Sequence, residues 1–200
     1  MAVIVSPDGT EEIVKDSIPT ESGIKLVVDG DVTLKIMDNA KSFADVREHW
    51  AKDSIDFVSA RGLMSGTSAA AFAPDAPTTR AQFWTILARQ AGVDLSGGSV
   101  WYEKAQEWVK ASGISDGTNP NGTITRAQMV TMLHRAAGSP EVESAGVFTD
   151  VPAGSYYEKA VAWAVENGIT TGVGNGGFDP NGACTRAQVA TFLTRIYLNK

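Results

Sequence analysis

Three stretches of the chain carry apolar residues at the spacing of an amphipathic helix, and a glycine follows each stretch. They cover about residues 50–61, 101–112 and 156–167. In the third stretch Tyr157, Val161 and Ala164 are four and three residues apart, which places them on one helical face. Each following glycine can end the helix, because glycine adopts a left-handed backbone at little steric cost. The pattern therefore predicts three similar helices.

A second helix is predicted after each of these, and its first residues are the same every time. The sequence Thr-Arg-Ala-Gln occupies residues 79–82, 125–128 and 185–188. Threonine at the N-cap with glutamine three residues later is a capping box, in which two side chains satisfy free backbone amides. The apolar stripes expected to be buried are Phe83, Ile86 and Leu87, then Met129, Met132 and Leu133, then Val189, Phe192 and Leu193. A second arginine stands nine residues after each motif arginine, at Arg89, Arg135 and Arg195, and we expect it to be solvated or to cap a helix C-terminus.

The chain is thus predicted to contain three helix–loop–helix repeats, at residues 43–95, 96–142 and 143–200. The glycine that ends the first helix precedes the motif arginine by 18 residues in the first and third copies and by 13 in the second. The second copy therefore has a shorter loop. One such helix pair cannot bury its own apolar face, so the copies are expected to pack as one cooperative unit. The predicted fold class is all-α, with a small β-hairpin appendage at the N-terminus.

That appendage is residues 1–42, where the pattern changes. Residues 24–28 and 32–36 flank Asp29-Gly30-Asp31, a strong signal for a β-hairpin. Residues 3–5 and 12–14 bracket a second turn at Pro7-Asp8-Gly9. An isolated hairpin would be marginally stable, so we expect this segment to pack on the helices or to be partly mobile.

Composition narrows the possible functions. The formal net charge is −6, from 17 basic and 23 acidic residues, which argues against a broad electrostatic hold on nucleic acid or on an anionic membrane. The single cysteine excludes an intramolecular disulfide. No apolar run is long enough to span a membrane. The first residues do not resemble a signal peptide, so a secreted parent would contain this chain as an internal or C-terminal piece.

Catalytic and metal chemistry find no support in the sequence, so no enzyme activity, cofactor or metal is expected. The segment that begins at Asp116 lacks the glycine and glutamate positions of an EF-hand loop. His49 and His134 are isolated and are expected at the surface. Cys184 is best explained as a small packed residue. The glycine-rich residues 172–177 lack the lysine of a phosphate-binding loop.

Taken together, the motifs resemble a triplet of S-layer homology domains. The matching elements are Phe-x-Asp-Val at residues 43–46 and 148–151, the Gly-Ile/Leu-x-x-Gly junctions, the loops around Phe72 and Phe178, and the three Thr-Arg-Ala-Gln sequences. The resemblance runs from residue 43 to about residue 198. All three copies carry glutamine where the family usually has glutamate, and the second copy lacks the opening Phe-x-Asp-Val.

The resemblance implies a pseudo-threefold bundle on the bacterial cell surface whose inter-repeat grooves bind secondary cell-wall polysaccharide, in many members a pyruvylated amino sugar. It assigns ligand contact to the motif arginines Arg80, Arg126 and Arg186. Arginine suits a carboxylate because its planar fork donates two parallel hydrogen bonds. The helix N-terminus is expected to help, through unpaired amides and a partial positive charge. A structural role for these arginines, paired with Asp45, Asp150 or a helix C-terminus, is the alternative.

Aromatic residues and glycines complete the candidate site. Trp50, Trp101 and Tyr156 could each offer a flat surface to a sugar ring, or could equally be core residues. Gly66, Gly117 and Gly172 could let the backbone approach a glycan closely. An alternative function is a protein–protein interaction or self-assembly module of a surface layer. The sequence does not identify the sugar, the number of working grooves or the oligomeric state.

Overall fold

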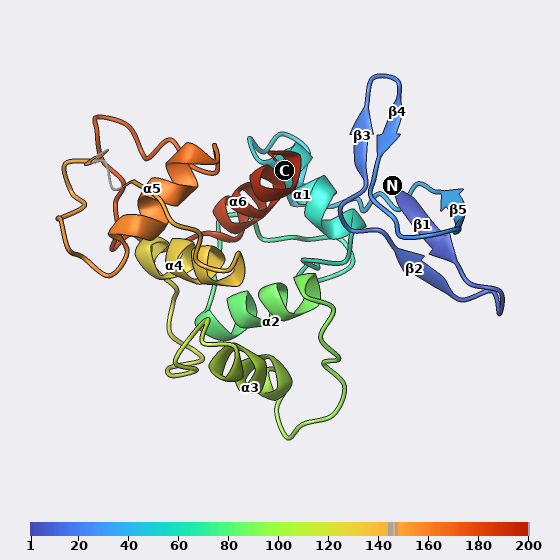
Figure 1. Cartoon of the computed structure of the whole chain (residues 1–200), viewed down its shortest axis with the longest axis horizontal. Helices are drawn as coiled ribbons and strands as arrows, with labels where there is room; N and C mark the ends of the chain where they lie inside the picture. The colour runs from blue at the N-terminus through green and yellow to red at the C-terminus, as the bar shows by residue number, and fades with distance from the viewer. Residues whose placement is uncertain (144–145, 147, 200) are drawn as a thin grey trace.

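The computed structural model describes residues 1–143, 146 and 148–199. Within that part of the chain, α-helices follow a short N-terminal region of strands (Figure 1). The helices are α1 (Lys52–Ala60), α2 (Arg80–Gln90), α3 (Glu103–Ala111), α4 (Arg126–Ala136), α5 (Glu158–Glu166) and α6 (Arg186–Leu198). A short 3-10 helix, Ala44–Val46, precedes α1. The predicted helix pairs are thus present in each repeat, and the first helix of each pair begins two residues later than expected.

The N-terminal region forms two antiparallel sheets. The strands are β1 (Ala2–Val5), β2 (Glu11–Ile13), β3 (Ile18–Thr20), β4 (Gly23–Lys25) and β5 (Thr33–Ile36). One sheet has the order β2–β1–β5, and the other is the β3–β4 hairpin. The predicted turn at residues 7–9 is confirmed, since β1 pairs with β2. The predicted hairpin around Gly30 is wrong: β5 pairs with β1, and β4 pairs with β3.

The all-α prediction is also wrong, because the described residues form a mixed fold of six α-helices and five strands. The physical reason is that β1 pairs with a strand on each side, β2 on one and β5 on the other. A three-stranded sheet satisfies the backbone groups of the central strand and offers a face that can pack, whereas a lone hairpin is only marginally stable. Ala2, Val3, Val14 and Ser17 are buried, so this region is an integral part of the fold.

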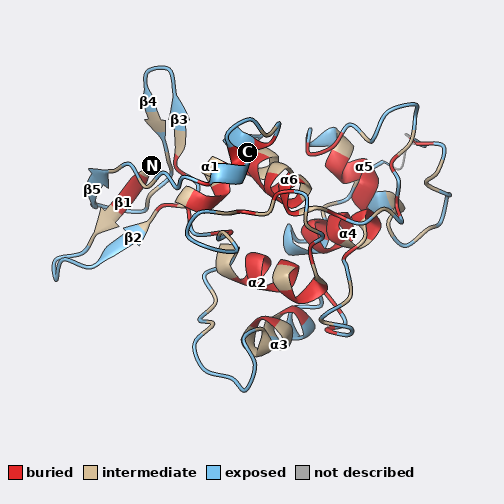
Figure 2. Cartoon of the chain, turned by 180° about the vertical axis from the view of Figure 1, so that it is seen from behind, coloured by how far each residue is buried: buried red, intermediate tan, exposed pale blue. Residues whose placement is uncertain are grey.

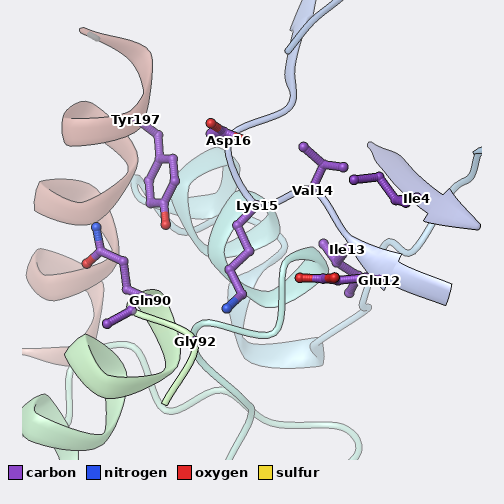
Figure 3. Close-up of a pocket in the computed structure, with 10 residues that line it drawn as sticks. Ile4, Glu12, Ile13, Val14, Lys15, Asp16, Gln90, Gly92 and Tyr197 are labelled. Atoms are coloured by element: carbon purple, nitrogen blue, oxygen red, sulfur yellow. The ribbon is translucent and has the colours of Figure 1, made fainter. Parts of the chain in front are cut away.

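Buried polar contacts join the sheet region to the helices. The Arg61 guanidinium, just after α1, donates from Nε to the Lys15 carbonyl at 3.0 Å and from Nη2 to the Ser17 carbonyl. Lys15 Nζ in turn donates to the Arg89 carbonyl near the end of α2. A cavity of about 450 Å³ remains beside these contacts, between the strands and Tyr197 of α6 (Figure 3). The expectation that this segment packs on the helices is confirmed.

The three repeats close into a ring through the residues that precede each motif threonine. The backbone amide of Thr78 donates to the Cys184 carbonyl, that of Cys184 to Ile124, and that of Ile124 back to Thr78, at 2.9–3.1 Å. Helices pair across copies: α2 packs on α3, α4 on α5, and α6 on α1. The unit of packing therefore joins the second helix of one copy to the first helix of the next, and α1 with α6 closes the ring.

The core lies on the inner faces of these helices (Figure 2). All nine residues of the predicted stripes are buried, from Phe83 in α2 to Leu193 in α6. Phe72 and Phe178, from the loops before α2 and α6, are fully buried beside them. In all three second helices the capping box is formed as predicted. Local motif and long-range packing thus agree at the start of each second helix.

Candidate functional site

The three motif arginines are buried, and each one reaches into the following copy of the ring. Arg80 Nε donates to the Thr118 carbonyl at 2.8 Å, Arg126 Nε to Phe178 at 2.7 Å, and Arg186 Nε to Phe72 at 2.8 Å. Burial lowers the pKa of Arg126 and of Arg186, because desolvation penalises the charged form. The common Nε contact shows that each arginine has a structural role between copies.

The outer nitrogens of these arginines have different partners. Arg80 Nη2 contacts the Asp116 carboxylate and donates to Ser115 Oγ at 3.3 Å. Arg186 Nη2 donates to the Ser65 carbonyl at 2.6 Å. The buried Nη2 of Arg126 has no hydrogen-bond partner among the described residues. Of the three motif arginines, only Arg80 therefore forms an ion pair with a carboxylate among the described residues.

Asp45 and Asp150 hold loops in place and do not form ion pairs with the arginines. The Asp45 carboxylate accepts hydrogen bonds from the amides of Phe72 and Ala73 at 2.7–3.1 Å. The amide of Phe72 is the largest cause of the lowered pKa of Asp45. Asp150 accepts in the same way from Phe178 and Asp179, both at 2.8 Å. Each aspartate thereby fixes the phenylalanine whose carbonyl receives a motif arginine.

Two of these arginines line surface grooves at equivalent positions of the ring. Groove 1, of about 100 Å³, is lined by Met64, Ser65, Gln82, Thr85, Ile86, Arg89, Trp101 and Arg186. Groove 2, of about 450 Å³, is lined by Arg80, Ile114, Ser115, Asp116, Gln128, Thr131, Met132, Arg135 and Tyr156. Each groove combines one face of a second helix, an aromatic residue of the next copy and a motif arginine of the preceding copy. The grooves therefore exist only because the ring is closed.

The aromatic candidates lie on the surface. Trp50, Trp101 and Tyr156 are 66%, 61% and 65% exposed, which excludes the alternative that they are core residues. Neighbouring rings brace two of them edge-on, Tyr102 beside Trp101 and Tyr157 beside Tyr156, at centroid distances of 5.2 and 5.0 Å. Rings that are exposed and held in place are suited to stacking.

The candidate glycines lie close to the protein's own side chains. A Cβ on Gly66 would stand 2.5 Å from the Phe43 ring, and one on Gly172 would stand 2.5 Å from the Phe148 ring. A Cβ on Gly117 would meet the Lys110 side chain. Internal packing alone thus requires glycine at these three positions, and their contact with a glycan stays a prediction.

The helix N-termini do not offer free amides, which corrects the expectation of an anion site there. In α2, the amides of Arg80 and Ala81 donate to the carbonyls of Gly122 and Pro120, and the amide of Gln82 donates to Thr79 Oγ1. The same pattern recurs at α4 and α6, where the loops of the next copy supply the acceptors. The contacts that close the ring use these amides. In grooves 1 and 2, the positive charge that could attract an anion therefore comes from the guanidinium groups.

Arg89 and Arg135 are groove residues whose position sequence reasoning missed. Arg135 Nη1 donates to the Ile114 carbonyl at 3.2 Å beside groove 2, whereas the Arg89 guanidinium has no hydrogen bond to any described residue. The signal was present in the helical period. Gln82, Thr85, Ile86 and Arg89 are separated by three, one and three residues and so share one face of α2.

The other candidate residues have structural explanations. Cys184 is buried and packed, as expected, and burial raises the pKa of its thiol to about 12. His134 is buried and its Nε2 lies 2.9 Å from the Pro140 carbonyl, so the surface prediction for this histidine is wrong. Within the described residues there is no cluster of three potential metal ligands. Among those residues, no helix has the length and apolar character needed to cross a bilayer.

Comparison with known proteins agrees with this architecture. The model of the S-layer homology domain matches residues 42–83 and 147–190. The chain is 31% identical over 173 residues to an amylopullulanase of Thermoanaerobacterium thermosulfurigenes, which covers 76% of this chain and 9% of that protein. It is 27% identical over 176 residues to the S-layer protein sap of Bacillus anthracis, covering 78% of this chain and 21% of that protein. An exoglucanase XynX of Acetivibrio thermocellus is 28% identical over 178 residues, covering 79% and 16%.

The chain thus spans only about a tenth to a fifth of the length of these relatives. These relatives carry names as different as amylopullulanase, exoglucanase and S-layer protein, so similarity to this chain is not tied to one activity. The matches at residues 42–83 and 147–190, with the same helix pair and capping box between them, identify the chain as a carrier of S-layer homology domains, the non-catalytic cell-wall anchoring modules of bacterial cell-surface proteins.

Proposed function

We propose that the chain anchors its parent protein by noncovalent binding of an acidic secondary cell-wall polysaccharide, with a pyruvylated sugar held in groove 1. The observation that carries this proposal is the pair of guanidinium groups in a groove lined without a carboxylate. Arg186 is buried and held by two backbone carbonyls, while the Arg89 guanidinium forms no hydrogen bond with any described residue. A carboxylate on the sugar is the group that best matches two such cations.

The size of groove 1 supports the binding of a substituent, with the sugar ring outside. About 100 Å³ accommodates a ketal-linked pyruvate and is too small to enclose a whole sugar ring. The ring would lie at the rim, where Trp101 is exposed and can cover its apolar face. Gln82, which stands where the family usually has glutamate, adds no negative charge to the groove. The acidic group would thus determine specificity, and the ring would contribute contact area.

The direct test is binding of the purified chain to cell-wall sacculi before and after mild acid removes the pyruvate. Retention of the chain is expected on the intact wall and not on the treated wall. A soluble pyruvylated monosaccharide should compete, and the same sugar without pyruvate should not. Equal retention on both walls would refute the role of the acidic substituent.

Lys52→Ala is a suitable charge control for the groove variants, because it removes one cation from the exposed side of α1, outside both grooves and outside β5. It should bind like the wild type. Loss of binding in this variant would indicate a general electrostatic attraction to the wall and would contradict a specific groove.

A further inference from the structure

The outer edge of the N-terminal sheet is open. In the strand order β2–β1–β5, strand β5 is terminal, and it lies at the end of the molecule away from most of the helices (Figures 1 and 2). Its apolar side chains are unusually accessible, since Leu34 is 40% and Ile36 is 62% exposed. Val32, just before the strand, is also exposed. An edge with these properties is a template for pairing with another strand.

The hydrogen-bond pattern shows which backbone groups point outward. Met1 and Met37 exchange both of their backbone hydrogen bonds at 3.1 Å, so they form a hydrogen-bonded pair of the β1–β5 ladder. Such pairs alternate with non-hydrogen-bonded pairs in an antiparallel ladder. Leu34 and Ile36, opposite Ile4 and Ala2, therefore occupy the alternate positions. Their N–H and C=O groups face the free edge.

The same strand, which is four residues long, lacks some of the features that usually protect an edge. It contains neither a proline nor a bulge, and its one lysine, Lys35, forms an ion pair with Glu11 of β2 at 2.7 Å. The side chains of Leu34 and Ile36 lie on the sheet face that also carries Ile4. An incoming strand would thus find outward backbone groups and a row of apolar side chains together.

We propose that this edge pairs with β5 of a second copy of the chain, antiparallel and centred on Leu34. In that register Leu34 lies opposite Leu34 of the second copy, and Val32 lies opposite Ile36. The outward backbone groups of these residues then bond with one another, and the apolar side chains form one continuous row. The result is a six-stranded antiparallel sheet across two molecules.

Charge favours this register over its neighbours. Centred on Leu34, Lys35 lies opposite Thr33 and diagonal to both Asp31 and Lys35 of the second copy, so an attraction and a repulsion of similar size offset each other and no like charges face directly. A register centred on Lys35 would place two lysines directly opposite each other. One centred on Ile36 would place Asp38 opposite Leu34. The sequence of β5 and its flanks is therefore self-complementary in one arrangement.

Pairing through β5 leaves both grooves of each copy free, because no residue of β5 lines either of them. Two linked modules on one polymer convert the second binding event into an intramolecular one, which raises avidity without a new ligand contact. This inference is independent of what the grooves bind.

The test is the molar mass of the chain by sedimentation equilibrium, over concentrations from about 1 µM to about 1 mM. A concentration-dependent dimer is expected. Leu34→Lys places two lysines at the centre of the pairing and should weaken dimerisation at least about tenfold. Val27→Lys is the matched control, since Val27 is an exposed apolar residue outside β5, and it should dimerise like the wild type. A chain that stays monomeric throughout, or a dimer unaffected by Leu34→Lys, would overturn the proposal.

A symmetric disulfide tests the register separately. Opposite residues of a hydrogen-bonded pair have Cα atoms about 5.5 Å apart, within reach of a disulfide. Leu34→Cys should therefore oxidise to a covalent dimer, whereas the Ile36→Cys side chains lie four residues apart along the paired strands and should not. The native Cys184 is buried and will not compete. Equal or faster cross-linking of Ile36→Cys would contradict the register.

Discussion

Grooves 1 and 2 occupy equivalent places in the ring and differ in how their arginines are balanced. In groove 2 the Arg80 guanidinium contacts the Asp116 carboxylate. In groove 1 the position equivalent to Asp116 is Ser65, and Arg186 donates to its backbone carbonyl. Groove 2 is the larger, at about 450 Å³ against about 100 Å³. Groove 1 therefore has arginines without a carboxylate in contact, and groove 2 has the larger volume.

The difference originates in the loops. Copy 1 has the long loop, so the Phe72 ring lies beneath the Arg186 guanidinium at 4.4 Å and its carbonyl accepts from Nε. Copy 2 has a loop five residues shorter and no equivalent ring, and Arg80 instead lies 5.5 Å from Trp84 of its own helix. An arginine held by a ring and carbonyls, on which the Asp45 carboxylate acts only from beyond ion-pair distance, keeps most of its attraction for an anion. One held by a carboxylate loses much of its attraction for an anion, so a shared fold does not imply equal binding.

Replacement of the motif arginines should give the largest contrast between the grooves. Arg186→Ala should weaken binding of a pyruvylated sugar about ten- to a hundredfold, since a hydrogen bond between charged groups contributes about 1.5–3 kcal/mol. Arg80→Ala should weaken it less than about threefold, because Asp116 already neutralises Arg80. Isothermal titration calorimetry with the soluble sugar measures both. A greater loss for Arg80→Ala would reverse the assignment of the grooves.

The Arg186→Ala variant needs a stability control. The substitution leaves the buried carbonyl of Phe72 and the partly buried carbonyl of Ser65 without their partner, which should lower the free energy of unfolding by about 1–3 kcal/mol. Binding must therefore be measured well below the melting transition. Arg186→Lys keeps a cation and should recover only part of the binding, because ammonium cannot reproduce the planar fork.

Removal of the aromatic surfaces should have a smaller effect with the same asymmetry. Trp101→Ala should weaken binding about three- to tenfold, the range expected from an aromatic contact of about 0.5–1.5 kcal/mol. Tyr156→Ala in groove 2 should change it less. Both rings are exposed, so the free energy of unfolding should shift by less than about 0.5 kcal/mol, measured by chemical denaturation. Val173→Ala, at an exposed apolar residue outside both grooves, is the control and should have no effect on either quantity.

Changing the side chains at the two equivalent positions, Ser65 and Asp116, tests whether charge balance separates the grooves. Asp116→Asn removes the carboxylate that competes for Arg80 and should raise the affinity of groove 2 about two- to fivefold. Ser65→Asp places a carboxylate beside Arg186 and should lower the affinity of groove 1 by a similar factor. Calorimetric stoichiometry distinguishes the two sites. If neither exchange alters affinity, charge balance at this position is not what separates the grooves.

The features that could be predicted from the sequence are those set by residues close together in the chain. The capping box needs only Thr79 and Gln82, three residues apart, and the buried stripes follow from the helical period. The β1–β2 hairpin was predicted from a short turn for the same reason. Residues 24–28 carry an equally good local signal, yet they do not pair with β5, because β1 competes for it and forms a wider sheet.

The site depends on contacts that no local pattern contains. Groove 1 brings Arg186 of the third copy and Trp101 of the second to a helix of the first, which requires the α6–α1 closure of the ring. That closure also uses the helix N-terminal amides that were expected to attract an anion. Resemblance to a family identified the motif arginines, but only the arrangement of copies shows that Arg89 lies beside Arg186 and that Asp116 neutralises Arg80.

Acid should reduce the small stability difference that Asp116 makes. The amide of Thr118 is the largest cause of its lowered pKa, with Arg80 adding to it, so the folded state favours the charged carboxylate. This contribution is complete above the ordinary value of 3.8 and is lost as the pH falls through the lower folded value. Wild type should therefore melt slightly above Asp116→Asn at pH 6, and the two thermal midpoints should converge below pH 3.8. The gap should be small, because the carboxylate is mostly exposed and water screens it.

Asp45→Asn, which removes the acceptor of the Phe72 amide on the groove 1 side, should show the same convergence. Circular dichroism melts across this range measure both, and a gap that widens in acid would show that the Asp116 carboxylate does not stabilise groove 2 through its charge.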